Sequence, residues 1–110
     1  NEYIKYNFYE IDDHLTTLIN DLNLIKDNTA YHYIDFLKKK GIDNDLIISF
    51  FNFFILKISI CIKSNIDKKH VIYLLSMHKY LNSLKIKFIT FNMSHEHLLV
   101  HYFDTLKNGK

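Results

Sequence analysis

The stretch LIISFFNFFILKISICIK, residues 46–63, decides the fold. It is apolar nearly all the way round a helix, and Asn52 and Lys57 are its strongly polar interruptions before the end. A helix that is apolar on every side has to be covered by other elements. The stretch is too short and too interrupted for a membrane span, which needs about 20 mostly apolar residues. We therefore predict that residues 45–64 form the central helix of a small globular bundle, with no membrane contact.

Composition limits the classes of function. The chain has 110 residues, enough for one domain with one core, and 48% of them are apolar. Its formal net charge is only +2, and all 14 basic residues are lysine. Reading of guanine depends mainly on arginine, so we expect no direct contact with nucleic acid. Nucleic-acid binding stays an alternative only if several lysines of the chain share one face. These are Lys38–Lys40, Lys68, Lys69, Lys85 and Lys87.

The segment before the central helix predicts a helix that begins after Asp12 or Asp13. An apolar stripe at steps of three and four residues runs from Leu15 to Phe36, which favours one helix over 13–39. The side chains of Asp27 and Asn28 can take hydrogen bonds from the backbone that a helix would need. The alternative of two helices with a break near 27–28 is therefore kept. Gly41 is the expected left-handed C-cap. We expect residues 1–11 to be an arm and 12–108 to be one helical domain, excised from a longer protein.

The segments after the central helix predict two more helices. Asp43, Asn44 or Asp45 caps the central helix, and Ser64-Asn65 ends it. The third helix runs from Asn65 or Asp67 to about Leu84, and 85–92 is either an extended connector or a continuation of that helix. A last helix follows Ser94. The expected inward faces are Val71, Leu74, Leu75, His78 and Leu81 in the third helix and Leu98, Leu99, Tyr102, Phe103 and Leu106 in the last.

Polar residues offer little chemistry. His97 and His101, one helical turn apart, are the best candidates for metal ligands, but no cysteine is near them in sequence, and we expect no metal. No glycine-rich phosphate loop exists, because the only glycines are Gly41 and Gly109. We therefore expect neither a cofactor nor catalytic residues. His78 and Asn52 interrupt apolar stretches, and we expect them to act as structural hydrogen-bonding hubs.

The overall pattern resembles the ACDC (AP2-coincident) domain of apicomplexan AP2-type transcription factors. The resemblance rests on the lead-in DDHLTTLINDLNLI (residues 12–25), on the apolar second helix and on LLSMH (residues 74–78). It implies a bundle of four strongly crossed helices. Our own fold prediction is an all-α bundle of four to five crossed helices around the central apolar helix. The resemblance also implies a nuclear protein that carries its DNA-binding domain elsewhere in the chain.

The expected function is that of a non-catalytic protein-protein interaction module of a transcription regulator. Surplus aromatic and apolar residues would anchor the partner, and a homodimer is left open. The expected groove is lined by Tyr33, Phe36, Tyr80 and Tyr102. The alternative is a viral Bcl-2-like bundle, also built around an apolar helix, that binds amphipathic death-motif helices.

Overall fold

The apolar stretch lies within α4, Asn44–Ser64, which supplies much of the core. Asp43 precedes the helix in extended conformation, and its Oδ1 accepts a hydrogen bond from the Leu46 amide at 2.8 Å. This cap satisfies one of the amides that a helix start leaves without a partner. Asn65 follows the last turn and is again extended. Both predicted ends of the central helix are confirmed.

The computed structural model describes residues 8–91 and 94–108, and it is an all-α bundle. Five α-helices and one 3-10 turn make up the described parts of the chain, which contain no strand. The predicted fold class is confirmed. The elements besides α4 are α2 (Tyr9–Asn20), η1 (Leu22–Leu24), α3 (Thr29–Lys39), α5 (Lys68–Phe91) and α6 (His95–Asn108).

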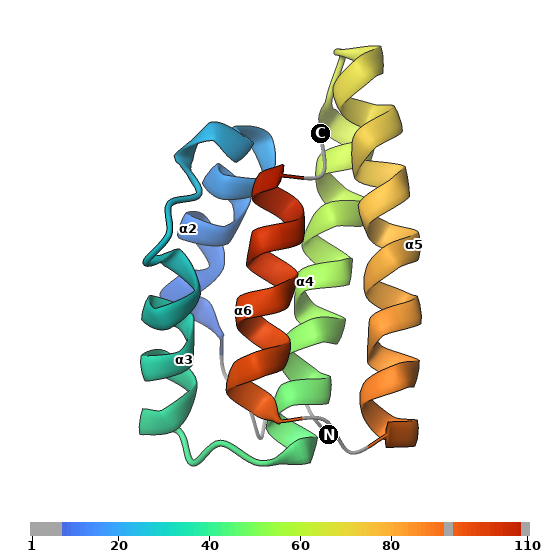
Figure 1. Cartoon of the computed structure of the whole chain (residues 1–110). Coiled ribbons are helices and arrows are strands. Elements are labelled where there is room, and N and C mark those ends of the chain that lie inside the picture. Colours follow the sequence, from blue (N-terminus) through green and yellow to red (C-terminus); the bar gives the residue numbers. More distant parts are fainter. Residues whose placement is uncertain (1–7, 92–93, 109–110) are drawn as a thin grey trace.

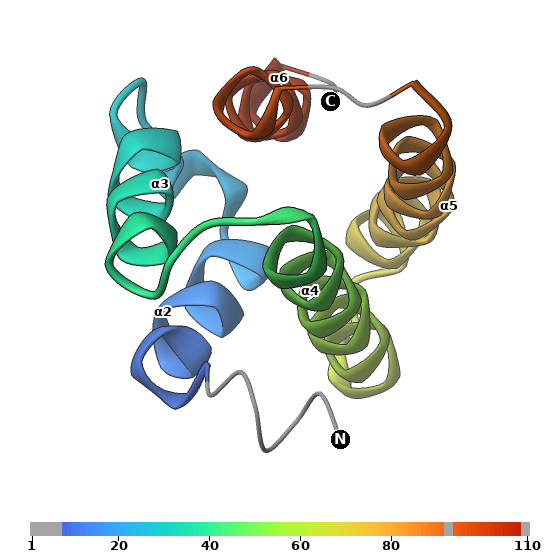
Figure 2. The ribbon, with the colours of Figure 1, turned by 90° about the horizontal axis from the view of Figure 1, so that it is seen from below.

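Helices α4 and α5 form a long hairpin whose far end extends beyond the other helices (Figure 1). Seen along the bundle, α6 lies between α3 and α5, and α2 lies beside α4 (Figure 2). Aromatic rings fill the space between them. Tyr33 of α3 stacks on Phe103 of α6 at 5.1 Å, and Phe54 of α4 meets Tyr102 edge-on at 5.1 Å. The core therefore joins α3, α4 and α6 through aromatic pairs.

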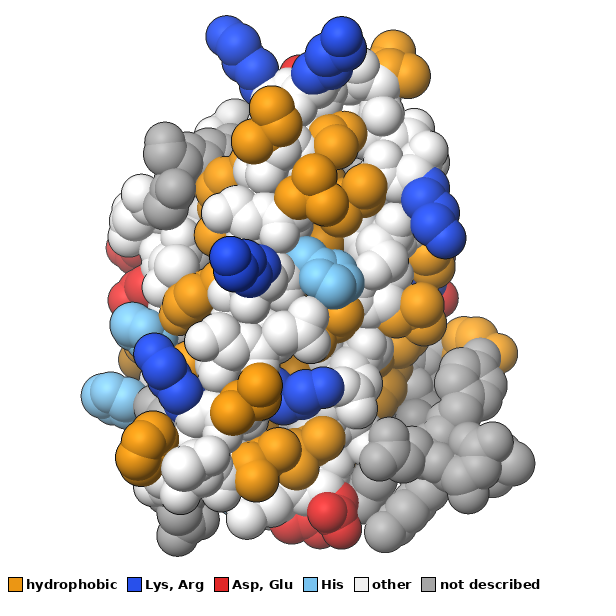
Figure 3. All heavy atoms as spheres, turned by 90° about the vertical axis from the view of Figure 1, so that its right-hand side faces the viewer, with side chains coloured by type: hydrophobic (Ala, Val, Ile, Leu, Met, Phe, Trp, Pro, Cys, Tyr) orange, Lys and Arg blue, Asp and Glu red, His pale blue; other side chains and the backbone are white. Residues whose placement is uncertain are grey.

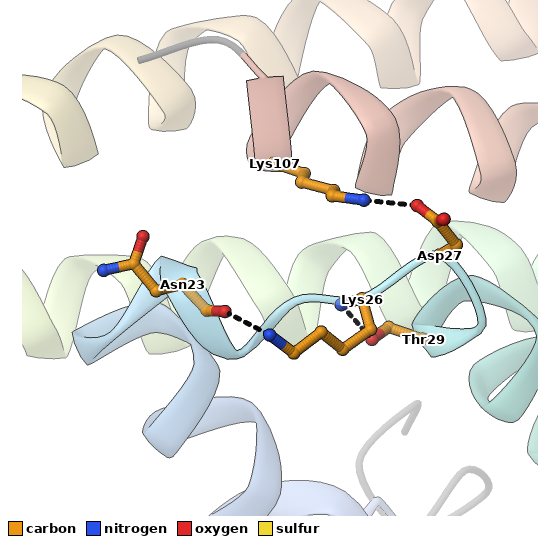
Figure 4. Close-up of polar contacts among 5 residues, drawn as sticks. All are labelled: Asn23, Lys26, Asp27, Thr29 and Lys107. Atoms are coloured by element: carbon orange, nitrogen blue, oxygen red, sulfur yellow. Dashed lines mark hydrogen bonds and ion pairs between the residues drawn. The ribbon is translucent and has the colours of Figure 1, made fainter.

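The preferred prediction of one helix over residues 13–39 is wrong. The Asp21 carboxylate accepts from the Asn23 amide at 3.2 Å and begins the 3-10 turn. The Thr29 hydroxyl accepts from the Lys26 amide at 2.9 Å, just where α3 begins (Figure 4). Short polar side chains thus replace helical hydrogen bonds here. The apolar spacing misled the prediction, because Leu22 and Ile25 stay buried although the backbone around them is not one continuous helix.

An ion pair holds the connection between η1 and α3 against α6. The Lys107 ammonium of α6 pairs with the Asp27 carboxylate, and the Lys26 ammonium donates to the Asn23 carbonyl at 3.2 Å (Figure 4). Lys107 lowers the pKa of the Asp27 carboxyl through its hydrogen bond and its charge. Two similar links join other helices: Lys57 pairs with Asp12, and Lys38 pairs with Glu96.

The predicted boundary at 11–12 is also wrong. Phe8 is buried with its ring centroid 5.2 Å from that of Phe53, and α2 begins directly after it, so residues 8–11 belong to the bundle. Residues 1–7 of the expected arm lie outside the described residues. Helix α5 runs on to Phe91, which confirms the helical alternative for residues 85–91 and buries Phe88.

Helix α4 is apolar on most sides but is not covered on all of them. Phe50, Phe51 and Phe54 are at most 1% exposed, whereas Leu56 is 52% and Ile60 48% exposed. By length and composition α4 meets the criteria for a membrane-spanning helix, which the core helix of a globular domain also meets. The uncovered side of α4 therefore adds apolar area to the molecular surface.

Candidate functional site

Helix α5 carries two apolar stripes on opposite faces. The inner stripe is buried against the bundle and contains Leu74, Met77, Leu81, Leu84 and Phe88. The second stripe is shifted by two residues, about 200° round the helix, and therefore faces away from the core. We call this second stripe the outer stripe, and it consists of Ile72, Leu75, Lys79, Asn82, Ile86 and Ile89.

The four aliphatic members of the outer stripe are strongly exposed. Ile72 is 67%, Leu75 54%, Ile86 62% and Ile89 60% exposed. Single exposed apolar residues are ordinary, but a row of them on one helix face is typical of an interaction site. Figure 3 shows this side of the molecule, where apolar side chains gather in two areas, one toward each end of the hairpin.

Helix α4, the neighbour of α5, also carries exposed apolar residues. The Lys85 ammonium donates to Asn52 Oδ1 at 2.7 Å and so ties α5 to α4. Leu56 and Ile60, one and two turns after Asn52 on α4, are exposed as well. We call the outer stripe together with Leu56 and Ile60 the outer surface.

The charge of the outer surface is of one sign. Helix α5 contains no aspartate or glutamate, but it contains five lysines: Lys68, Lys69, Lys79, Lys85 and Lys87. Figure 3 shows basic side chains between the apolar areas, whereas acidic side chains appear only toward the margins of the view. Lys79 lies in the middle of the outer stripe and forms no ion pair within the described parts of the chain. The surface thus combines apolar side chains with positive charge that its own helix does not neutralise.

The predicted groove of Tyr33, Phe36, Tyr80 and Tyr102 is not brought together at the surface. Tyr33 is 2% exposed and Tyr102 is fully buried, so neither can anchor a partner in this arrangement, and this part of the prediction is wrong. Phe36 is half-buried under the Lys40 ammonium at 5.0 Å. Tyr80 is half-buried, and its hydroxyl lies 3.3 Å from Thr105 Oγ1. The three tyrosine rings pack against rings of α4 or α6, and the Phe36 ring packs against that of Phe8.

His78 and Asn52, the two expected hubs, each have few hydrogen-bond partners in the structure. The His78 side chain is half-buried, and its Nδ1 lies 3.3 Å from Asn82 Nδ2, one turn further along the same helix. Asn52 is exposed, and its partner Lys85 belongs to the neighbouring helix. Asn52 therefore links two helices, while the hydrogen bonds of His78 to Asn82 stay within α5. Two of the residues predicted to face inward, Leu75 and Val71, are exposed and half-buried respectively.

The histidines at the start of α6 are spread over the surface. His95 Nε2 lies 2.7 Å from Asn44 Oδ1 at the start of α4, and His97 and His101 are exposed. Within residues 8–91 and 94–108 no group of three histidine, cysteine or acidic side chains is arranged to hold a metal ion. Cys61 is buried at 1% exposure. Burial raises the pKa of its thiol, against the smaller opposing effects of Lys57 and Asn20.

The outer stripe was missed at the level of sequence, although its signal is present there. Its members recur at intervals of three and four residues, and so do those of the inner stripe. The predicted inward face took Leu74 and Leu81 from the inner stripe and Leu75 from the outer one. Spacing alone does not say which stripe faces the core when one helix carries two.

Comparison of the chain with protein-family models, with curated proteins and with solved structures gave no match. The function is therefore argued from the outer surface itself.

Proposed function

We propose that this chain is a non-catalytic helical interaction module that binds a protein partner on its outer surface. The observation that carries the proposal is the second apolar stripe of α5, which no other described element covers. Exposing Ile72, Leu75, Ile86 and Ile89 to water is unfavourable, and a partner that buries them recovers roughly 25 cal/mol for each Å². The side chains of the outer stripe are aliphatic except for Lys79 and Asn82.

The setting that we propose for this module is a nuclear transcription regulator whose DNA-binding domain lies elsewhere in the protein. This follows from the resemblance of residues 12–25 and 74–78 to the ACDC domain. In that setting the helical domain binds another protein and leaves DNA recognition to the other domain. The positions of the lysines favour this division, because Lys38 pairs with Glu96 and lies on α3, on the other side of the bundle from the lysines of α5 (Figure 2).

Site-directed photo-crosslinking tests the proposal. Benzoylphenylalanine replaces Leu75 on the outer surface, or Leu24 in η1 as the matched control, which is 44% exposed against 54% for Leu75. Each protein is irradiated in nuclear extract. We expect a discrete protein adduct from position 75 and none from position 24. No adduct at position 75, or the same adduct from both positions, would contradict the proposed docking surface.

A further inference from the structure

We propose that the occupant of the outer surface is an amphipathic helix with acidic flanks and a carboxylate in the middle of its apolar stripe. The inference rests on the proposed function and names the chemistry of the partner. Three properties of the outer surface carry it: the spacing of its apolar residues, the sign of its charge and the polar interruption at its centre.

The spacing favours a helix as the occupant. The members of the outer stripe follow one another at intervals of three, four, three, four and three residues, which is the heptad spacing of a coiled-coil seam. From Ile72 to Ile89 the stripe is about 27 Å long at 1.5 Å per residue. A partner helix of similar length, with its own apolar residues at a and d positions, packs against such a stripe along its whole length.

The charge favours an acidic occupant. Lys69 and Lys85 flank the stripe on its two sides, and α5 has no carboxylate to offset them. Glutamates at the flanking positions of a bound helix would lie next to these ammonium groups. Complementary charge of this kind speeds association and excludes partners of the wrong sign.

The centre of the stripe specifies one further feature. Lys79 and Asn82 separate the aliphatic pair Ile72 and Leu75 from the pair Ile86 and Ile89. An aliphatic side chain opposite Lys79 would bury an ammonium group without a partner, which is costly. A carboxylate there accepts hydrogen bonds from the Lys79 ammonium group. A polar residue in an otherwise apolar seam also fixes the register of the two helices.

A second copy of this chain fits the stripe less well. In an antiparallel pair Ile72 would lie opposite Ile89 of the other copy, so the apolar residues could match. In this register Lys79 would lie opposite Asn82 of the other copy, so the two Lys79 ammonium groups would come within about one helical turn of each other, and neither α5 helix brings a carboxylate. Like charges placed together in this way oppose association. We therefore assign the surface to an acidic helix and treat dimerisation as the competing outcome of the test.

The test uses the whole 110-residue chain and labelled synthetic peptides of about three heptads. The acidic peptide has leucine at the outer a and d positions, aspartate at the central position and glutamate at the flanks. One control peptide has the same composition in shuffled order, and another has lysine in place of every acidic residue. Fluorescence anisotropy measures binding, and sedimentation velocity of the chain alone measures self-association.

We expect micromolar binding of the acidic peptide, because one helix face is at the small end of specific interfaces. Both control peptides should bind at least about tenfold more weakly. Leu75→Ser should weaken binding about tenfold, and the matched variant Leu24→Ser should leave it unchanged. Both residues are exposed, so both variants are expected to fold, and circular dichroism checks this. Raising the salt concentration should weaken binding, because it screens the exposed lysines.

A charge exchange tests the central position. Lys79→Glu should weaken binding of the peptide with central aspartate and strengthen binding of one that differs only in a central lysine. The proposal is overturned if the acidic peptide fails to bind, if the basic peptide binds as well, or if Leu75→Ser and Leu24→Ser behave alike. It is also overturned if the chain dimerises through Leu75 and excludes the peptide. Any of these results alone would remove the acidic helix as the occupant and leave the proposed interaction module in place. If the photo-crosslinking experiment also failed, both proposals would be removed.

Discussion

Ile72 and Leu74 are two residues apart on α5 and lie on opposite faces of the helix, with Leu74 1% exposed and Ile72 67% exposed. The same division holds along the helix for the inner and outer stripes. One face of α5 therefore stabilises the fold, and the other is free to vary without loss of stability. This division leads to the first prediction.

Leu74→Ala should destabilise the domain, whereas Ile72→Ala should not. Removing a buried leucine side chain leaves a cavity and costs about 2–5 kcal/mol of unfolding free energy. The change at exposed Ile72 should stay within about 0.5 kcal/mol, because it creates no cavity and alanine favours helix. Urea denaturation followed by circular dichroism measures both variants. Equal losses in the two variants would show that the assignment of the two faces is wrong.

The parts of the fold that the sequence predicted correctly depend on neighbouring residues or on a single apolar stripe. Asp43 begins α4 as predicted because its carboxylate has a nearby amide to cap. The inward face of α6 was predicted in full, since its apolar residues form a single stripe and are all buried. Gly41 has a φ of +84° directly after α3, as expected of a left-handed C-cap.

The parts that sequence missed depend on tertiary contacts. Leu22 and Ile25 continue the apolar spacing of α2 through a region that is not α-helical, so periodicity could not reveal the break. Tyr33 and Tyr102 were assigned to a surface groove because an aromatic residue suits a core and an interface equally well. The candidate site was missed for a related reason, because two stripes of equal spacing share α5 and only packing decides between them.

Two tyrosines of the bundle should respond in opposite ways to loss of their hydroxyl. The Tyr102 hydroxyl is buried and has no hydrogen-bond partner within the described residues, whereas the Tyr73 hydroxyl donates to the Leu106 carbonyl at 2.7 Å. Tyr102→Phe should therefore raise the unfolding free energy by about 1 kcal/mol, because it removes an unpaired buried polar group. Tyr73→Phe should lower it by about 1 kcal/mol, because it removes a hydrogen bond.

Urea denaturation of the two single variants and of the parent measures this difference. The two substitutions remove the same atom, so each serves as the control for the other. A loss of stability in Tyr102→Phe would show that its hydroxyl makes a favourable interaction.

The domain should lose stability as the pH rises above about 10. Burial raises the pKa of Tyr33, Tyr73 and Tyr102 above the usual value of about 10. The folded state therefore keeps these protons at a pH where the unfolded chain releases them. Their contribution to stability is complete below pH 10 and is lost as the pH rises toward the folded-state pKa values. Each such tyrosine adds a slope of up to about 1.4 kcal/mol per pH unit.

Urea midpoints measured from about pH 8 to about pH 11 test this dependence. Lysines also titrate in this range, so the comparison that matters is between the parent and Tyr102→Phe. Above pH 10 the stability of the variant should fall less steeply with pH than that of the parent, because one titrating tyrosine is missing. Identical slopes in the two proteins would show that Tyr102 does not titrate differently in the folded and unfolded states.

Cys61 should react with a thiol reagent only when the domain opens. Its side chain is 1% exposed on α4, and burial raises the pKa of the thiol, so both access and thiolate are scarce in the folded state. Labelling with Ellman's reagent should be slow in buffer and fast in concentrated urea. Leu74→Ala should accelerate labelling in buffer, because lower stability raises the population of open molecules. Ile72→Ala should label at the parent rate, and fast labelling of the parent itself would mean that α4 is not held in the core as described.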